Sequence, residues 1–400
     1  MKTAVMYGAG NIGRGFIGAL LAHSGYHVTF IDVAEDVIDA INALGRYPVC
    51  TSDGVTSEET WVENISAVNG NDADAAARAI AECEFLCTSV GAKALRFIAP
   101  NLAAGVKARL AAGRGPLDIL ICENLMDADA YLEGLLRQYL TAEEMEQIGL
   151  VETSVGRMVP AQTPEMKGDH PLRICTEPYF FLPVDSSAFK GPIPPVRNLV
   201  PHSPFRYYVE RKLYNHNMAH AVTAYLGEYL NIALIRDAIA VPEIRLLVNG
   251  AILESATALS KKYGASPVKL HEHAVNLLYR FQNPGLDDTC ARVGADVPRK
   301  LAANDRLVGA ARSVEEQGGK PVYLCLGIAA ALRQYLAEQG AEQTEGNAAG
   351  ALRTFSGLDA GDFISECALR LYGRFAANEP IAAVLRAADR EKALANTENI

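Results

Sequence analysis

The first 35 residues alternate between short apolar runs and one segment with helical spacing. Residues 2–8 (KTAVMYG) and 27–33 (HVTFIDV) are short and apolar, as is typical of buried strands. Residues 15–25 place their large apolar side chains on one face and close on Gly25, which indicates a helix. The pattern predicts a βαβ unit with parallel strands and a right-handed crossover.

The same alternation continues through the first half of the chain. Residues 83–95 (CEFLCTSVGAKAL) predict a strand that runs into a turn of small residues at Ser89–Gly91, and residues 117–125 (LDILICENL) predict a strand ending at Asn124. Alternating strands and helices of this kind favour an α/β fold with a Rossmann-type doubly wound sheet. Ligands of such sheets lie beyond the carboxyl ends of the strands, which is where Asn124 is expected.

The second half of the chain has a different periodicity. Prolines cluster in residues 183–204, a stretch that interrupts regular structure and is typical of a crossover between domains. Apolar residues then recur at helical spacing, and we expect a mostly α-helical C-terminal domain. The predicted helices are 207–229, 240–262, 266–281, 320–338 and 361–376, with a fraying helix at 388–400. We therefore divide the chain into an NAD-binding Rossmann domain, 1–195, and a helical substrate-binding and catalytic domain, 196–400.

Composition narrows the classes of partner. The 400 residues are 50% hydrophobic and 21% charged, as in ordinary globular proteins, and the formal net charge is −10. This charge disfavours nucleic acid and anionic membranes as partners, although a local basic cluster can still hold a small anion. No apolar run reaches the roughly 18 residues of a membrane span. We expect a cytoplasmic protein with a small-molecule substrate, acting as a monomer or a small homo-oligomer.

Glycines mark the turn between the first strand and the first helix. In Gly8-x-Gly10-x-x-Gly13, the first glycine permits a tight bend, the second lets a pyrophosphate approach the backbone, and the third lets helix and strand pack. Asp32, at the end of the second strand, can accept hydrogen bonds from ribose hydroxyls and would repel a 2′-phosphate. This context favours NAD over a purely structural turn and over NADP. The expected cofactor-binding residues are Gly8, Ala9, Gly10, Asn11, Ile12, Gly13, Asp32, Ser89 and Val90.

One helix of the second half carries an unusual set of polar side chains. At about 100° per residue, Lys212, His216, His220 and Asn217 fall within an arc of about 140°. Taken singly, each is compatible with a solvated side chain, but together they favour a site that handles protons. A metal site is disfavoured because no carboxylate completes the two histidines, and we expect no metal. A second histidine cluster, at 271–273, is expected to be an ordinary feature of a surface helix.

The spacing Lys212-x4-Asn217-x2-His220 resembles the signature of the polyol-specific long-chain dehydrogenases, a family that includes mannitol 2-dehydrogenase and the hexuronate reductases. The similarity extends over essentially the whole chain, through GAGNIGRGFIG, ENLMDAD, VETSVGRMVP, RKLYNHNMAHAVTAYLG and ARVGADVPRKLAANDRL. It implies a metal-independent, NAD-dependent interconversion of mannitol 1-phosphate and fructose 6-phosphate. It further implies that Lys212 is the catalytic base, that Asn217 and Asn124 hold the reacting oxygen, and that His220 orients the substrate.

The chemistry of a secondary alcohol agrees with these assignments. When hydride leaves the carbinol carbon, the hydroxyl proton must leave as well, and a neutral lysine amine can accept it. Burial beside a positive charge would lower the pKa of Lys212 towards working pH. The oxygen develops negative charge that amide N–H donors can stabilise.

Two features favour a phosphorylated substrate. Mannitol dehydrogenases of the family carry Val-Asp-Arg where this chain has Val155-Gly156-Arg157, so a carboxylate that would repel a phosphate is missing. Cations also gather in an acidic chain, and we expect Arg292, Arg299 and Lys300 to bind substrate or phosphate. A departure is Ala295, where phosphate-specific relatives carry an arginine. The alternatives are a dehydrogenase of an unphosphorylated polyol or hexuronate, and an NAD-sensing protein without activity.

Overall fold

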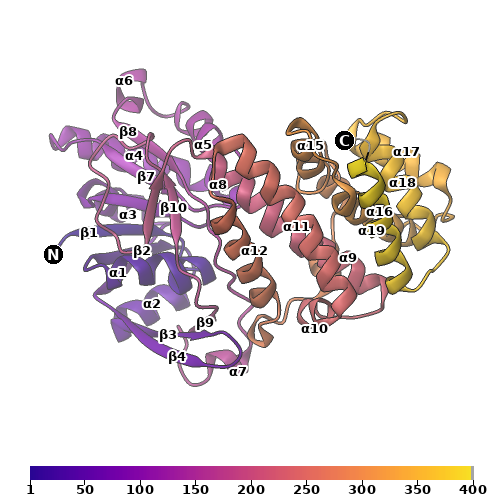
Figure 1. Ribbon diagram of the computed structural model, residues 1–400. Coiled ribbons are helices and arrows are strands. Elements are labelled where there is room, and N and C mark those ends of the chain that lie inside the picture. The colour runs from indigo at the N-terminus through magenta and orange to yellow at the C-terminus, as the bar shows by residue number, and fades with distance from the viewer. Residues whose placement is uncertain (398–400) are drawn as a thin grey trace. The chain divides into compact units, whose positions relative to one another are not determined.

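The computed structural model describes residues 1–397, and the chain divides into two compact units, Met1–Tyr208 and Val209 to the end (Figure 1). The two units differ in secondary structure, because every strand among the described residues lies in the first unit and the second is helical. The division falls inside helix α8 (Arg206–Arg211), later in the chain than the boundary at 195 that the proline cluster suggests. Among the helices of residues 1–397, none has the length and apolar character needed to cross a membrane.

The first unit is built around a parallel six-stranded sheet with the order β5-β2-β1-β6-β7-β8. This is the doubly wound order in which the chain starts at the centre and fills one side before the other. The predicted Rossmann-type sheet is confirmed. The strands are β1 (Thr3–Tyr7), β2 (His27–Asp32), β5 (Ile65–Asn69), β6 (Phe85–Thr88), β7 (Leu117–Ile121) and β8 (Ile148–Glu152).

Alternation along β1 explains why the sheet has two cores. Ala4 and Met6 pack on one face with residues of η1 (Gly13–Gly18), α1 (Ala19–His23) and α2 (Glu35–Leu44), whereas Val5 and Tyr7 pack on the other. The second face is covered by α3 (Ala73–Glu82), α4 (Leu95–Ala111) and α5 (Ala128–Leu136). Because both faces are buried, the strands are apolar almost throughout.

Two small sheets accompany the main one and were not predicted from the sequence. Strands β3 (Arg46–Ser52) and β4 (Ser57–Glu63) form an antiparallel hairpin, and β9 (Ile174–Thr176) pairs with β3 in parallel. Strands β10 (Leu182–Asp185) and β11 (Leu199–His202) form a parallel pair. The short helices of this unit are η2 (Ala92–Ala94), α6 (Ala142–Met145) and α7 (Pro164–Lys167). A side chain at Gly15 would collide with Ile174, so β9 lies directly against the helix that follows the glycine turn.

The second unit is helical, as the apolar spacing predicts. Helices α9 and α16, whose residues are mostly buried, pack on each other and α11 packs on both; Gly327 of α16 lies so close to Val222 of α9 that a side chain there would collide. The helices are η3 (Lys212–Asn217), α9 (Met218–Tyr229), α10 (Ile235–Ala240), α11 (Pro242–Tyr263), α12 (Pro267–Phe281), η4 (Pro284–Leu286), α13 (Cys290–Gly294), α14 (Val297–Lys300), α15 (Val308–Glu316), α16 (Val322–Glu338), α17 (Glu345–Ser356), α18 (Phe363–Ala376) and α19 (Ile381–Thr397).

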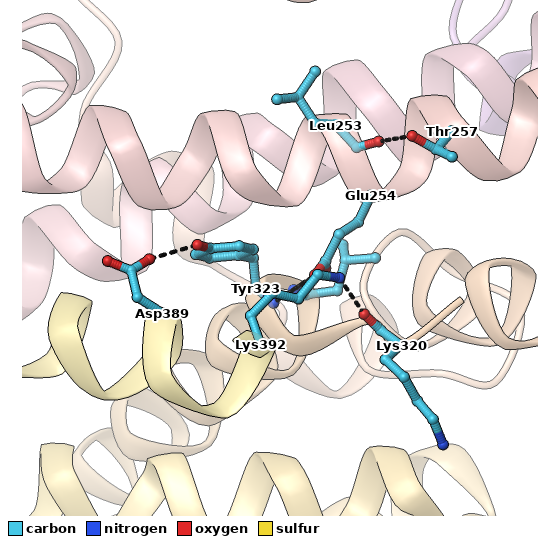
Figure 2. Close-up of polar contacts among 8 residues, drawn as sticks. Leu253, Glu254, Thr257, Lys320, Tyr323, Asp389 and Lys392 are labelled. Atoms are coloured by element: carbon cyan, nitrogen blue, oxygen red, sulfur yellow. Dashed lines mark hydrogen bonds and ion pairs between the residues drawn. The ribbon is translucent and has the colours of Figure 1, made fainter. Parts of the chain in front are cut away.

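The last helix is anchored by polar contacts rather than frayed along the residues described (Figure 2). Lys392 of α19 donates to the buried carboxylate of Glu254 at 2.7 Å and to the carbonyl of Lys320 at 2.6 Å. The same carboxylate accepts the backbone N–H groups of Tyr323 and Leu324 at the start of α16. The final residues of the predicted fraying helix, 398–400, lie outside the described chain.

One strand boundary differs from the sequence prediction, and some short helices were not predicted. Strand β7 ends at Ile121, so Asn124 belongs to the bend after the strand rather than to its last position. The predicted helix at 240–262 is confirmed as α11, which begins at Pro242, a residue favoured in the first turn of a helix, whereas the short helix α10 before it was not predicted. Helix α17 was not predicted, because only Ala348, Leu352 and Ser356 of its twelve residues are buried.

Candidate active site

The glycine turn has the space that a phosphate-binding loop requires. Gly8 has a positive φ of +104°, and a side chain there would collide with the backbone of Ser89. A side chain at Gly13 would collide with the carbonyl of Gly8, so helix and strand approach as closely as the backbone allows. A Cβ at Gly10 would meet nothing within 4 Å. The turn is therefore closed on its inner side and open at Gly10.

The helix after the turn begins at residue 11 and runs without interruption to His23. Its residues Gly13–Gly18 form a π-helical segment, and the backbone N–H of Arg14 donates to Gly10 at 3.0 Å. The first N–H groups of such a helix have no partner within the helix, and they carry the positive end of its dipole. The segment suits an anionic ligand placed over Gly10, Asn11 and Ile12.

Asp32 is held firmly at the end of β2. One carboxylate oxygen accepts the backbone N–H of Ala9 at 2.5 Å, and the other accepts those of Val33 at 2.7 Å and Ala34 at 3.1 Å. These bonds join the glycine turn to the loop that follows β2. The oxygen that accepts only the N–H of Ala9 retains a lone pair, so the half-buried Asp32 can still accept a hydroxyl.

A buried carboxylate orders the second turn of the expected cofactor site. Glu123 accepts the backbone N–H groups of Val90 and Gly91, both at 2.8 Å. Burial raises the pKa of Glu123, and the two N–H donors oppose that rise. Glu123 thus fixes the turn at Ser89–Gly91, whereas its neighbour Asn124 is exposed in the bend after β7.

The polar helix of the second unit contains a π-helical segment that extends from Lys212 to Asn217. In a π-helix a residue bonds back to the residue five positions earlier, so Asn217 lies one turn from Lys212 rather than well round the helix. Lys212, Asn217 and His220 are half-buried, and residues 213–216 between them are buried. The three side chains predicted to act together therefore share the accessible edge of one helix.

His220 is oriented by two neighbours from later in the chain. Its ring stacks on Phe281 with centroids 4.9 Å apart, and its Nε2 lies 3.4 Å from a carboxylate oxygen of Asp288. Arg292, one turn along from Asp288, pairs with the same carboxylate. Burial alone would raise the pKa of Asp288, but the contacts with His220 and Arg292 outweigh it and hold the pKa below its ordinary value.

His216 differs from His220 although it lies one turn away. It is buried, and burial together with the charges of Arg280, His220 and Lys212 lowers its pKa well below the ordinary value. A neutral, buried His216 packs edge-on against Phe281. The histidines of 271–273 also differ, because His271 is exposed whereas burial lowers the pKa of His273 well below its ordinary value. The two histidines of the predicted surface cluster therefore have different surroundings, because His273 is half-buried on α12.

The cations expected to bind phosphate have unequal surroundings. Arg299 donates through Nε to Asp296 at 2.6 Å, and Arg292 is engaged by Asp288. Lys300 is 4% exposed, and burial with the nearby charges of Arg306 and Arg299 lowers its pKa to about 8. Lys300 is therefore the cation whose charge is least neutralised by a direct carboxylate contact.

Three site residues could not be recognised from the helix and glycine patterns. Glu123 and Asp288 act on candidate residues through contacts that join distant parts of the sequence, and Arg14 lies next to the glycine turn as a buried cation. The sequence offered a signal for two of them, because Arg14 directly follows the glycine motif and Glu123 directly precedes Asn124. For metals, residues 1–397 contain no group of three or more His, Cys, Asp or Glu side chains arranged to hold an ion.

The first unit has the features that a dinucleotide needs. Gly10 leaves open space, Asp32 offers an acceptor at the end of β2, and two buried guanidinium nitrogens of Arg14 have no hydrogen-bond partner within residues 1–397. The strand order and the glycine turn define this unit as a Rossmann-type dinucleotide-binding domain.

Comparisons with known proteins place the chain in a family. The mannitol dehydrogenase Rossmann domain matches residues 2–198, and the mannitol dehydrogenase C-terminal domain matches residues 205–350. The chain belongs to the mannitol dehydrogenase family, which confirms the resemblance read from the sequence. It is 38% identical over 335 residues to a Bacillus subtilis (strain 168) protein named mannitol-1-phosphate 5-dehydrogenase, covering 82% of this chain and 87% of that one. A Brevibacillus brevis protein of the same name is 38% identical over 333 residues, covering 82% and 85%.

Solved structures show the same fold. Pseudomonas fluorescens mannitol 2-dehydrogenase, solved as a ternary complex with NAD and D-mannitol, matches with a TM-score of 0.74 and 15% identity, covering 97% of this chain and 94% of that one. A D-sorbitol dehydrogenase in substrate-free form matches with a TM-score of 0.79 and 15% identity, covering 95% of each chain. At this identity the likeness concerns architecture alone.

Proposed function

We propose that the chain is an NAD-dependent dehydrogenase that interconverts D-mannitol 1-phosphate and D-fructose 6-phosphate. The observation that carries the proposal is the 38% identity over 335 residues to a protein named mannitol-1-phosphate 5-dehydrogenase. The choice of NAD is supported by Asp32, a carboxylate at the end of β2 that would repel a 2′-phosphate. The glycine turn, Asn11, Ile12, Ser89 and Val90 complete the proposed coenzyme site.

The proposed chemistry assigns one task to each polar side chain of the second unit. When bound, NAD would supply the hydride acceptor for the carbinol carbon. Lys212 removes the proton from the carbinol oxygen in oxidation and returns it in reduction. Asn217 donates an amide N–H to that oxygen, and Asn124 is a second proposed donor; one such donor is typically worth about 3 kcal/mol in the transition state.

His220 is proposed to orient the substrate hydroxyl groups. Support comes from its ring, which Phe281 holds on one face while Asp288 lies 3.4 Å from Nε2. If the N–H is on Nε2 it points to Asp288, so that Nδ1 is left as an acceptor for a hydroxyl. A fixed tautomer gives a fixed hydrogen-bond pattern for the polyol.

The phosphate is proposed to bind at Lys300, with Arg299 and Arg292 contributing. Support for Lys300 is its burial beside Arg299 and Arg306, which forms a local positive region in a chain of net charge −10. Two observations favour a second candidate, an unphosphorylated polyol or hexuronate: Arg292 and Arg299 are already paired with Asp288 and Asp296, and Ala295 adds no charge.

Rates of NADH formation across a small substrate panel separate the two candidates. The panel contains mannitol 1-phosphate, mannitol, glucitol 6-phosphate and mannonate, each with NAD and with NADP. We expect kcat/KM for mannitol 1-phosphate to exceed that for mannitol by about 100-fold or more, since hydrogen bonds to a charged group each contribute about 1.5–3 kcal/mol. Equal efficiency on mannitol and its phosphate would establish the second candidate instead.

A further inference from the structure

Arg14 is a buried cation without a partner at the edge of the glycine turn. The residue is 6% exposed, and its Nε and Nη1 are sealed from solvent with no hydrogen-bond partner in the described chain. No ion pair involving Arg14 occurs within residues 1–397, although Asp32 and Asp36 are near enough to influence its charge. Its backbone is held, because the N–H donates to Gly10 and the carbonyl accepts the hydroxyl of Tyr47. The guanidinium alone is unsatisfied.

This placement is unfavourable for the unliganded chain. Burial is the main cause that lowers the pKa of Arg14, so the surroundings resist its charge. The positive end of the helix dipole adds to the cost, since Arg14 lies in the first turn of the run from residue 11 to His23. Buried polar groups in folded proteins almost always have partners, so an orphaned one calls for an explanation, and at the edge of a glycine turn a bound anion is one that fits its charge.

The surrounding residues indicate which end of a dinucleotide would meet Arg14. Asp32 ends β2, Asp36 opens α2, and Tyr47 opens β3, so Arg14 faces the side of the turn where β2 ends. In a Rossmann fold the acid at the end of β2 marks the adenosine ribose. Ser89 and Val90, after β6, lie on the other side of β1 in the sheet.

We propose that Arg14 anchors the adenosine monophosphate half of the coenzyme. This inference rests on the proposed NAD-dependent function. Because no hydrogen bond fixes the guanidinium, a change of rotamer breaks no bond and presents its N–H fork to the ribose and phosphate oxygens of that half. Arginine is suited to this contact, since its fork can donate two parallel hydrogen bonds to phosphate. Arg14 would thus be a binding residue of the coenzyme site, in addition to the backbone of the glycine turn.

The assignment is tested by coenzyme binding rather than by turnover. NADH affinity is measured by fluorescence for the wild-type chain, for Arg14→Met, for Arg14→Lys, and for the control Arg78→Met, which removes an exposed arginine of α3. We expect Arg14→Met to weaken NADH binding by about 10- to 100-fold, Arg14→Lys to weaken it less, and Arg78→Met to leave it unchanged. The melting temperature of unliganded Arg14→Met should equal or exceed that of the wild type, because an unpaired buried charge is removed.

Fragments of the coenzyme show which half is involved. AMP and nicotinamide mononucleotide are each titrated against bound NADH, and we expect Arg14→Met to weaken AMP as strongly as NADH and to leave the nicotinamide fragment within twofold. Unchanged NADH affinity together with a lowered melting temperature would identify Arg14 as a structural cation and overturn the assignment. So would equal weakening of both fragments. If Arg14→Met does not fold, Arg14→Lys carries the same comparison. A wild-type chain that binds no NADH would overturn the proposed function itself, and the assignment with it.

Discussion

Both candidate sites contain a six-residue π-helical segment, yet they use it in opposite ways. In the first unit, Gly13–Gly18 carries three buried glycines that let the helix pack closely on its surroundings, and the backbone left open for a ligand lies just before it, at Gly10. In the second unit, Lys212–Asn217 carries an amine, an imidazole and two amides, and the site consists of side chains. A site made of backbone depends on side chains being absent, so that a ligand can approach the N–H groups. A site made of side chains depends on the neighbours that orient each side chain and set its charge.

Because of this difference, substitutions should be able to change coenzyme binding without changing proton transfer, and the reverse. A backbone site binds but has no group that gains or loses a proton at neutral pH. In the side-chain site, burial lowers the pKa of Lys300 to about 8, and Lys212 is the proposed acid–base group. We therefore assign coenzyme binding to the first unit and proton transfer to the second, and changes in one should leave the other intact.

Replacement of Lys212 gives the largest expected effect. Lys212→Met should lower kcat by about 10²- to 10⁴-fold in both directions, because a positioned acid–base group contributes that much to the rate. NADH affinity should stay within twofold of the wild type. Steady-state rates and NADH fluorescence titrations measure the two quantities.

The pH profile provides the control for that variant. In the wild type, polyol oxidation should rise as Lys212 loses its proton, and ketose reduction should fade, since reduction needs the ammonium as acid. The residual activity of Lys212→Met should lack this dependence. Normal turnover without the amine would remove the basis for the mechanism, as would a pH-independent oxidation rate in the wild type from neutral to alkaline.

A pair of glycine replacements separates folding from binding within the first unit. The Cβ of Gly13→Ala would collide with the carbonyl of Gly8, and such overpacking typically costs about 1–3 kcal/mol of unfolding free energy. The Cβ of Gly10→Ala meets no atom within 4 Å, so stability should not change. It would instead occupy the space left for pyrophosphate and weaken NADH by about 10- to 100-fold.

Urea unfolding and NADH titration of both variants complete that comparison. Each variant should retain the affinity of the second unit for fructose 6-phosphate. If Gly10→Ala binds NADH as the wild type does, the pyrophosphate does not lie against Gly10, and the open side of the turn has another explanation.

The sequence is most informative where structure is determined locally. The βαβ unit, the glycine turn and Asp32 lie within about 30 consecutive residues. The spacing of these residues alone therefore predicts the strands, the helix and their order along the chain. The family signature Lys212-x4-Asn217-x2-His220, on the polar helix of the second unit, is equally local. Its π-helical geometry is not, because helical spacing at 100° per residue puts Asn217 well round from Lys212, whereas the π-helix brings them together.

What the sequence could not reveal are contacts between residues far apart in the chain. Asp288 contacts His220 although the two are far apart in the sequence, and Glu123, in the bend after β7, accepts the N–H groups of Val90 and Gly91 from the turn after β6. The β3–β4 hairpin was missed because only Val62 of β4 is buried, which leaves no apolar pattern to detect. The paired state of Arg292 and Arg299 was also hidden, and it weakens the expectation that these cations are free for phosphate.

The smallest expected effect is a difference in pH dependence between the two units. Because the pKa of Lys300 is lowered to about 8, its ammonium form predominates below that pH and is lost as pH rises through it. The Kd of fructose 6-phosphate, measured by calorimetry in the Lys212→Met chain so that Lys212 does not contribute, should rise up to about tenfold between pH 7 and 9. The second ionisation of the phosphate, near pH 6, is complete over this range and adds nothing. In Lys300→Arg the charge is permanent, so the Kd of fructose 6-phosphate should not depend on pH.

The Kd of NADH should also be independent of pH over this range, since backbone N–H groups do not titrate. A steep pH dependence of NADH binding, or none for the sugar phosphate, would show that the division of roles between backbone and side chains is wrong.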